Sequence, residues 1–229
     1  MTESDIHFVI EAFVNAAADA KKLGFDGVEI HGAHGYLIDQ FFWKQTNQRI
    51  DRYRGDEVEG RTRFASEIIA SVRKAVGPDF PIVLRISQWK TSSYNAKLAD
   101  TPEQLAAFLE PLTAAGVDAY HCSTRRFWEP EFEGSDLNLA GWVRALTRKP
   151  TITVGSVGLD EEFMSSMMPG KVSQTTGIEG VIERLSRNEF DLVAVGRSLL
   201  ADPEWAMKIR SGRWDELKPF TVDVLRTLF

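Results

Sequence analysis

The sequence predicts an α/β fold built on parallel strands, and three observations support this prediction. Short apolar runs of strand length alternate with segments whose apolar residues recur at helical spacing. The alternation repeats roughly every 30 to 40 residues, the length of a strand-helix-strand unit. The 229 residues are 43% hydrophobic and 26% charged, a composition typical of a folded chain with a sizeable core.

The first half of the chain contains two helix-strand pairs with clear boundaries. Apolar residues at helical spacing over 6–20 predict the first helix, and residues 25–31 predict the strand that follows. Residues 61–76 predict a second helix, because Gly77 and a proline come directly after it. Residues 81–87 are nearly all apolar and predict a buried strand.

The second half repeats the same pattern three times and ends in a helical tail. The predicted segments are a helix over 102–115, a strand over 117–123, a helix around 138–146, a strand over 151–154, a helix around 178–186 and a strand over 191–195. No linker or change in composition divides the chain, so we expect one domain over 1–229. Five parallel strands suit either a flavodoxin-like doubly wound sheet or five-eighths of a (β/α)₈ barrel, and their number does not decide between them.

Charge and cysteine content exclude several classes of protein. With a net charge of −6, the chain has no overall basic field for nucleic acid or for an acidic membrane surface. Cys122 is the single cysteine, which excludes a disulfide framework and fits a reducing, cytoplasmic location. No apolar run approaches the ~20 residues of a membrane span, and the N-terminus does not resemble a signal peptide.

Polar residues stand at the ends of all five predicted strands. These are His31, Arg85, His121 with Cys122, Gly155 with Ser156, and Gly196 with Arg197. Ligands of parallel α/β folds bind at the carboxyl ends of the strands, so we expect a site there. The alternative is that each polar group meets a loop carbonyl or solvent.

The densest cluster is His31-Gly-Ala-His34-Gly-Tyr36, which we interpret as a glycine-rich loop. Two imidazoles three residues apart can donate hydrogen bonds to one oxygen, and Tyr36 can supply a proton nearby. A metal site requires a third ligand and the HExxH spacing is absent, so we predict no metal. The alternative is a turn whose histidines cap backbone groups.

The last two strand ends carry groups suited to phosphate. Gly196 allows close approach of the backbone, and the Arg197 guanidinium suits a bidentate contact. Gly155 and Ser156 would form the other half of this site, although neither piece matches a P-loop or a GxGxxG motif. Arg85 can pair with an anionic ring or a carboxylate, or can form a structural ion pair.

Several stretches occur in the same order as in a known family. They are GVEIHGAHGYLIDQF (27–41), TNQR (46–49), DRY (51–53), RFWEP (126–130), TVGS (153–156) and VGRSLLADP (195–203). Together they resemble the Old Yellow Enzyme family of FMN-dependent ene-reductases. The resemblance implies a (β/α)₈ TIM-barrel-type fold, of which this chain has about five of the eight βα units, corresponding to units four to eight.

The resemblance also implies a reaction and its substrate-binding residues. His31 and His34 would hold the carbonyl or nitro oxygen of an activated alkene, and Tyr36 would protonate its α-carbon. Trp128 would line the substrate side. NAD(P)H would reduce FMN, and the flavin would then pass hydride to the β-carbon of the alkene.

For the cofactor, the resemblance implies that Arg85 lies beside the pyrimidine edge of non-covalently bound FMN. Gly155, Ser156, Gly196 and Arg197 would bind its phosphate. The family's first three βα units, which also contact the flavin, have no counterpart here. We therefore expect weak FMN binding by the chain alone, and an N-terminal complement in trans or a homo-oligomer as partner. The alternative is a non-catalytic remnant or assembly module that keeps the phosphate-binding end.

Overall fold

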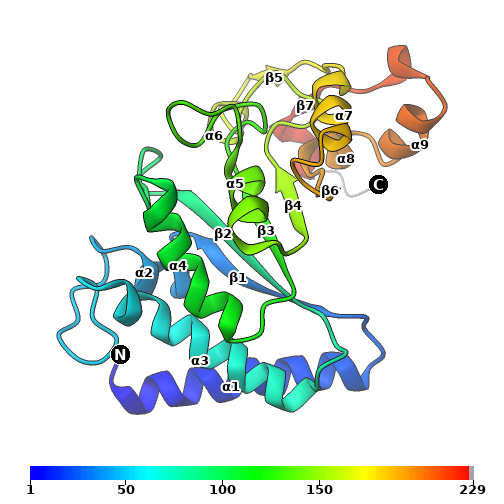
Figure 1. The fold of residues 1–229 in the computed structure, drawn as a ribbon. Helices are drawn as coiled ribbons and strands as arrows, with labels where there is room; N and C mark the ends of the chain where they lie inside the picture. The colour runs from blue at the N-terminus through cyan, green and yellow to red at the C-terminus, as the bar shows by residue number, and fades with distance from the viewer. Residues whose placement is uncertain (227–229) are drawn as a thin grey trace.

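A computed structural model describes residues 1–226 and shows a five-stranded parallel sheet flanked by helices (Figure 1). The strands are β1 (Val28–His34), β2 (Ile82–Lys90), β3 (Ala119–Ser123), β4 (Thr151–Val154) and β6 (Leu192–Val193). Their order in the sheet is β1-β2-β3-β4-β6, so each strand lies beside the strand of this sheet that precedes it in the chain. A doubly wound sheet reverses its order at a switch point, and this sheet does not. The order therefore supports the barrel-type alternative.

The longer helices follow the same succession. They are α1 (Glu3–Lys22), α3 (Val58–Val76), α4 (Pro102–Ala114), α5 (Leu139–Thr147) and α7 (Glu179–Ser186). Helix α1 packs on α3, α3 packs on α4, and α4 packs on α5. This confirms the predicted helices, with α3 beginning three residues before the predicted range because Val58 and Gly60 join its first turn.

Short elements that the sequence did not predict complete the structure. They are α2 (Leu37–Phe42), α6 (Phe163–Ser166), β5 (Val172–Ser173) and β7 (Phe220–Thr221). Strands β5 and β7 form a separate antiparallel pair. The predicted helical tail consists of α8 (Arg197–Ala201), α9 (Trp205–Arg210), η1 (Trp214–Glu216) and η2 (Val222–Arg226). In Figure 1 these C-terminal elements lie at the opposite end of the molecule from α1.

Alternation along the strands separates the core from a polar face. On β2, Ile82, Leu84 and Ile86 are buried in the hydrophobic core. Arg85 points the other way and is the register partner of both His31 and His121. Because successive strand residues point to opposite faces, these three side chains form a row across β1, β2 and β3.

The ends of β1 and β2 differ from the prediction. We interpreted residues 31–36 as a loop, but β1 continues through His34 and pairs with β2 as far as Lys90, with an irregular register between Gly32 and His34. The loop interpretation was wrong for residues 31–34, because glycine does not end this strand, whereas Gly35 and Tyr36 do form the turn that follows it. Gly32 instead lies where a Cβ would meet Phe42 and Leu84, so it permits close packing beneath the strand.

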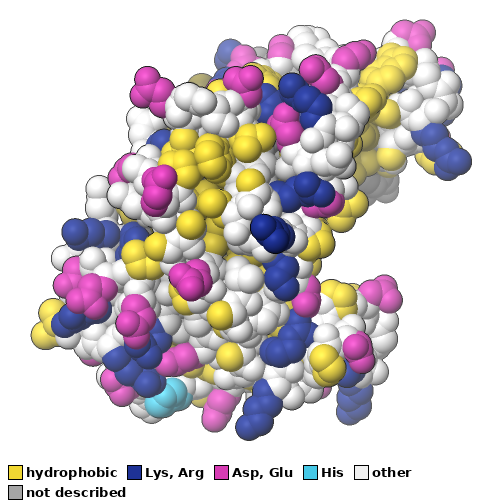
Figure 2. Space-filling view, viewed as in Figure 1, with side chains coloured by type: hydrophobic (Ala, Val, Ile, Leu, Met, Phe, Trp, Pro, Cys, Tyr) yellow, Lys and Arg dark blue, Asp and Glu magenta, His cyan; other side chains and the backbone are white. Residues whose placement is uncertain are grey.

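The surface offers no extended basic area on the face seen in Figure 2, where basic and acidic side chains are interspersed. We see no local reason there to propose a nucleic-acid interface. Within residues 1–226, no helix has the length and hydropathy that a membrane crossing requires.

Candidate active site

A cleft of about 380 Å³ lies at the carboxyl ends of the strands. The predicted site residues that line it are His34, Tyr36, Arg85, Gly155, Ser156, Gly196 and Arg197. They lie on or shortly after every strand of the sheet except β3, which contributes Ser123 instead. The chain thus brings into one cavity seven residues that are distributed over more than 160 positions of the sequence.

His34 and Tyr36 lie together at one end of this cleft, and His31 lies beside both although it does not itself line the cleft. The His31 ring centroid is 5.3 Å from that of His34 and 5.5 Å from that of Tyr36. His34 is held on two sides, because its ring stacks on Trp89 at 4.4 Å and its Nε2 lies 2.8 Å from the Ser123 hydroxyl. The Tyr36 side chain is 59% exposed. This arrangement offers several hydrogen-bond donors to one small region.

Both imidazoles are neutral near pH 7. Burial, reinforced by the Arg85 guanidinium, lowers the pKa of His34 to about 3. The pKa of His31 is also lowered, first by burial and then by the charge of Arg85. A neutral imidazole has one N–H donor and one acceptor nitrogen, so each ring can donate a single hydrogen bond to a substrate oxygen.

Arg85 does not form the structural ion pair that we had kept as an alternative. Among residues 1–226 its guanidinium has no salt bridge, and its buried Nε has no hydrogen-bond partner. The neighbouring Glu29 carboxylate instead contacts His121 of β3, whose Nδ1 lies 2.7 Å away. Burial lowers the pKa of Arg85, although arginine remains charged at physiological pH. The structure therefore leaves a cation facing the cleft without a protein anion bound to it.

The glycines at the other end of the cleft differ in what surrounds them. A Cβ on Gly155 would lie 2.6 Å from the Thr124 hydroxyl, so no larger residue fits without a shift. Among residues 1–226, no atom lies within 4 Å of such a position at Gly196, which leaves open space beside the first turn of α8. Gly155 is thus required by the protein itself, whereas Gly196 leaves room for a ligand.

Arg197 is already engaged within the protein. Its guanidinium donates to the carbonyl of Glu161 at 2.8 Å, to that of Glu162 at 3.3 Å, and to the Ser156 hydroxyl at 3.2 Å. Through Arg197, at the start of α8, these bonds connect the segment before α6 with the residue that follows Gly155 after β4. A phosphate contact by this side chain would compete with them.

Trp128 and Cys122 lie apart from the cleft. The Trp128 ring packs edge-on against Phe127 at 5.0 Å, and Trp128 is not among the residues that line the cavity. Its substrate-binding role stays a prediction without a contact to support it. Cys122 is fully buried in the core, which raises the pKa of its thiol. In the described part of the chain, no three candidate ligands are grouped as a metal site.

Sequence reasoning missed four residues that hold the site. Trp89 and Ser123 fix the His34 ring, while the buried ion pair between Asp39 and Lys90 lies beneath the following turn. The signal available in the sequence was weak: Lys90 is a charged residue that follows Ser87, Gln88 and Trp89 at the end of β2.

Comparison with known proteins supports the resemblance noted from the motifs. Residues 1–216 match the family described as NADH:flavin oxidoreductase / NADH oxidase. The chain is 37% identical to an NADH oxidase of Thermoanaerobacter brockii over 95% of its length and 31% of that protein. It is 32% identical to an NADPH dehydrogenase of Clostridium acetobutylicum, covering 96% of this chain and 60% of that one.

Solved structures show the same fold. Morphinone reductase in complex with tetrahydroNAD superposes with a TM-score of 0.70 at 24% identity, over 93% of this chain and 50% of that one. The old yellow enzyme from Trypanosoma cruzi gives the same TM-score at 23% identity. The chain spans between about a third and three fifths of the curated relatives it matches.

The match covers nearly the whole chain, and the five-stranded parallel sheet corresponds to half of these barrels. By sequence and fold, this chain belongs to the Old Yellow Enzyme family of NADH:flavin oxidoreductases.

Proposed function

We propose that this chain provides the substrate-activating and phosphate-binding parts of an FMN-dependent oxidoreductase. The reaction is the NAD(P)H-dependent reduction of the C=C bond of α,β-unsaturated carbonyl or nitro compounds. One observation carries the proposal: His34 and Tyr36, which are suited to activate an alkene, line the same cleft as the residues suited to bind FMN. The names of two relatives, a cinnamate reductase and an NADPH dehydrogenase, agree with such chemistry.

The cleft fits FMN in three respects. Its volume of about 380 Å³ falls within the ~300–1,000 Å³ typical of small-molecule sites. Arg85 has a buried Nε without a partner and would hold the anionic edge of the ring. Gly196 leaves open space at the start of α8, where a phosphate would approach the backbone. When bound, FMN supplies the hydride that it receives from NAD(P)H.

The chain's own residues prepare the alkene. His31 and His34, both neutral, would each donate one N–H to the carbonyl or nitro oxygen and draw electron density from the double bond. Tyr36 would transfer its hydroxyl proton to the α-carbon as general acid. Its ring lies next to His31, so the donor stands beside the oxygen-binding groups.

Partners are part of the proposal, because the chain spans only part of its relatives. Within the described sheet, β1 and β6 each have one neighbouring strand. We expect a further polypeptide, either an N-terminal complement or a second copy, to pair with these edges and complete the flavin site.

FMN titration of the purified chain, followed by flavin absorbance, tests the proposal. We expect weak, saturable binding that Arg85→Met weakens at least tenfold. Arg187→Met, which removes an exposed guanidinium outside the cleft, is the matched control and leaves the affinity unchanged. Absence of saturable binding, or equal affinity in both variants, contradicts the proposal. Tight stoichiometric flavin with rapid NADPH-dependent reduction of cyclohexenone contradicts the expectation that a partner is needed.

A second function is favoured by one specific observation. Arg197 donates to the Glu161 and Glu162 carbonyls, so its guanidinium is already engaged by the protein itself. An assembly module that no longer binds FMN would have this feature. The same titration separates the two functions, because the assembly module would show no saturable flavin binding.

A further inference from the structure

The proposed proton donor, Tyr36, has little holding its side chain in place. Its ring is 59% exposed, and among residues 1–226 its hydroxyl has no hydrogen-bond partner. Apart from the His31 ring, whose centroid is 5.5 Å away, the position of the phenol depends on the backbone on either side of Tyr36. Misplacement of a reacting group by about 1 Å costs roughly a hundredfold in rate, so this backbone matters for the chemistry.

The backbone before Tyr36 adopts a conformation that needs support. His34 has a φ of 64° and Gly35 a φ of 83°, both in the left-handed region. A residue other than glycine adopts this region at a cost of about 1 kcal/mol or more. The turn persists because neighbouring groups bind it: Ser87 accepts from the His34 N–H at 2.9 Å, and Thr91 donates to the His34 carbonyl at 3.0 Å.

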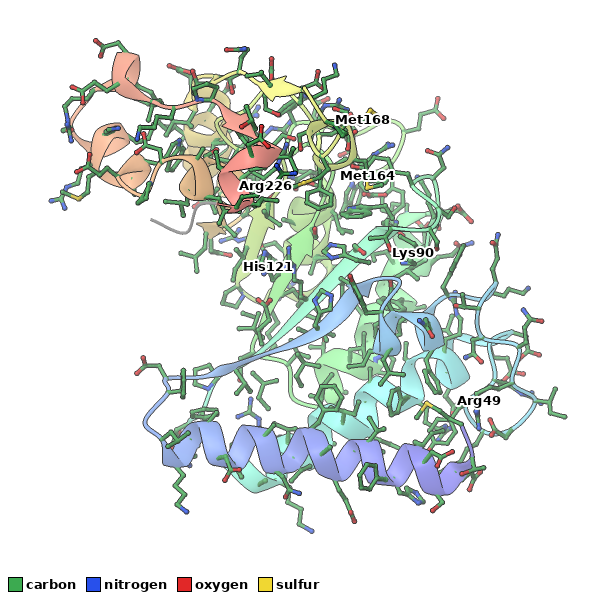
Figure 3. All side chains as sticks on the ribbon, turned by 180° about the vertical axis from the view of Figure 1, so that it is seen from behind. Arg49, Lys90, His121, Met164, Met168 and Arg226 are labelled. Atoms are coloured by element: carbon green, nitrogen blue, oxygen red, sulfur yellow. The ribbon has the colours of Figure 1, made fainter. Side chains whose placement is uncertain are left out.

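Gly35, the residue between His34 and Tyr36, is held from below. Its N–H donates to the Asp39 carboxylate at 2.7 Å, from the first turn of α2. The other Asp39 oxygen lies 2.9 Å from the Lys90 ammonium, and both side chains are fully buried. Lys90 also donates to the carbonyls of Ser87 and Gln88, which fixes it to the end of β2 (Figure 3).

This pair joins two elements at the turn that presents the donor. A buried ion pair contributes little to stability compared with apolar side chains of the same size, because both ions lose their hydration. Its advantage is directional: the ammonium orients the carboxylate, and the carboxylate binds one particular N–H. Neither residue lines the cleft, so neither contacts a ligand there.

We propose that Asp39 and Lys90 are positioning residues that hold Tyr36 and His34 for proton transfer and substrate binding. The proposal rests on the proposed function, because it assigns the pair a part in that reaction. In structural terms, Lys90 orients the Asp39 carboxylate, and this carboxylate determines where the Tyr36 ring lies.

The test uses two double variants that remove the ion pair and differ in one group. Asp39→Asn/Lys90→Met keeps an oxygen acceptor for Gly35, whereas Asp39→Leu/Lys90→Met removes it at nearly the same volume. The readout is ¹⁹F NMR of the full chain labelled with fluorotyrosine, which gives four resonances. Tyr36→Phe identifies the Tyr36 resonance, and the buried Tyr53 and Tyr120 serve as internal references.

We expect the Tyr36 resonance to shift by more than its linewidth in Asp39→Leu/Lys90→Met and to stay near its original position in Asp39→Asn/Lys90→Met. Tyr53 and Tyr120 stay unchanged in both. An unchanged Tyr36 resonance in the leucine variant overturns the proposal. Should that variant unfold, Asp39→Ala/Lys90→Met, which also removes the acceptor of the Gly35 N–H, decides: the proposal requires Tyr36 to move while Tyr53 and Tyr120 stay.

Kinetics of the flavin-loaded protein complete the test. We expect Asp39→Leu/Lys90→Met to lower kcat for alkene reduction roughly ten- to hundredfold, with FMN affinity and flavin reduction by NADPH unchanged. A loss of FMN affinity together with kcat indicates a structural role and overturns the proposal. Failure of the unmodified chain to bind FMN counts against the proposed function alone, since the NMR comparison requires no flavin.

Discussion

The two ends of the cleft are built differently. The alkene-activating end rests on β1, β2 and β3, which are 7, 9 and 5 residues long and packed against a continuous core. The phosphate end rests on β4 and β6, which are 4 and 2 residues long, and Leu192 of β6 is 59% exposed.

The two ends also differ in whether the protein itself binds their arginine side chains. Arg85 at the first end faces the cleft without a protein anion, whereas Arg197 at the second end is bound to its own chain. We infer that the first end is organised before any ligand arrives. The second end would have to exchange bonds with the segment before α6 when it binds phosphate. Four predictions test this contrast.

The largest expected effect concerns the packing beneath the first end. Phe64 of α3 is fully buried and its ring lies 4.4 Å from that of Phe41. Phe64→Ala should lower the free energy of unfolding by about 3–5 kcal/mol, because it leaves a cavity. Leu192→Ala on β6 should change it by less than about 0.5 kcal/mol. Urea unfolding followed by circular dichroism measures both, and equal losses would remove the distinction between the two ends.

Tyr36→Phe should separate the two half-reactions. We expect alkene reduction to slow roughly a hundredfold, since the general acid is lost, while flavin reduction by NADPH keeps its rate. Stopped-flow measurement of each half-reaction checks this. Tyr94→Phe is a suitable control, because its hydroxyl binds Glu162 outside the cleft. A similar slowing in both variants would count against Tyr36 as the proton donor.

The two glycines should respond differently to alanine. Gly155→Ala places a Cβ 2.6 Å from the Thr124 hydroxyl and should cost about 1–3 kcal/mol of stability. Gly196→Ala enters open space and should change stability by less than about 1 kcal/mol, yet weaken FMN binding. Thermal unfolding and flavin titration of the two variants provide the comparison. Unaltered FMN affinity in Gly196→Ala would show that phosphate does not approach this residue.

The smallest expected effect is a pH dependence at the first end. The pKa of His34 is about 3 in the folded chain, against 6.5 for a free histidine. Between these values the unfolded chain binds the additional proton, so the contribution of His34 to stability is lost as pH falls from about 6.5 toward 3. His34→Gln should reduce that loss by about 1 kcal/mol after solvent screening.

Asp39 acts in the opposite direction, since burial raises its pKa to about 6 and its folded form takes up a proton first. Asp39 is present in both the unmodified protein and His34→Gln. The change in melting temperature between pH 7 and pH 4 is therefore compared between these two proteins, and the difference reports on His34 alone. Parallel curves would contradict the lowered pKa.

Much of the fold was predictable from the sequence because its signals are local. Apolar periodicity and glycine at helix ends located the five strands of the main sheet and the five longer helices. The sequence placed His31, Arg85 and His121 only at strand ends, and the register of the assembled sheet put them side by side in one row. The short elements α2, α6, β5 and β7 were missed, because two to six residues contain too few turns or pleats for a periodic pattern.

For the site, the sequence by itself determined which chemical groups are present and at which strand ends. Only the tertiary structure decided how each group is used. Arg85, which lies within β2 and not at its end, faces the cleft, whereas Arg197 at the start of α8 binds carbonyls. Asp39 meets Lys90 across 51 residues, a contact that exists only because β1 lies beside β2. Such contacts depend on strand order and register, which are properties of the assembled sheet and not of any segment.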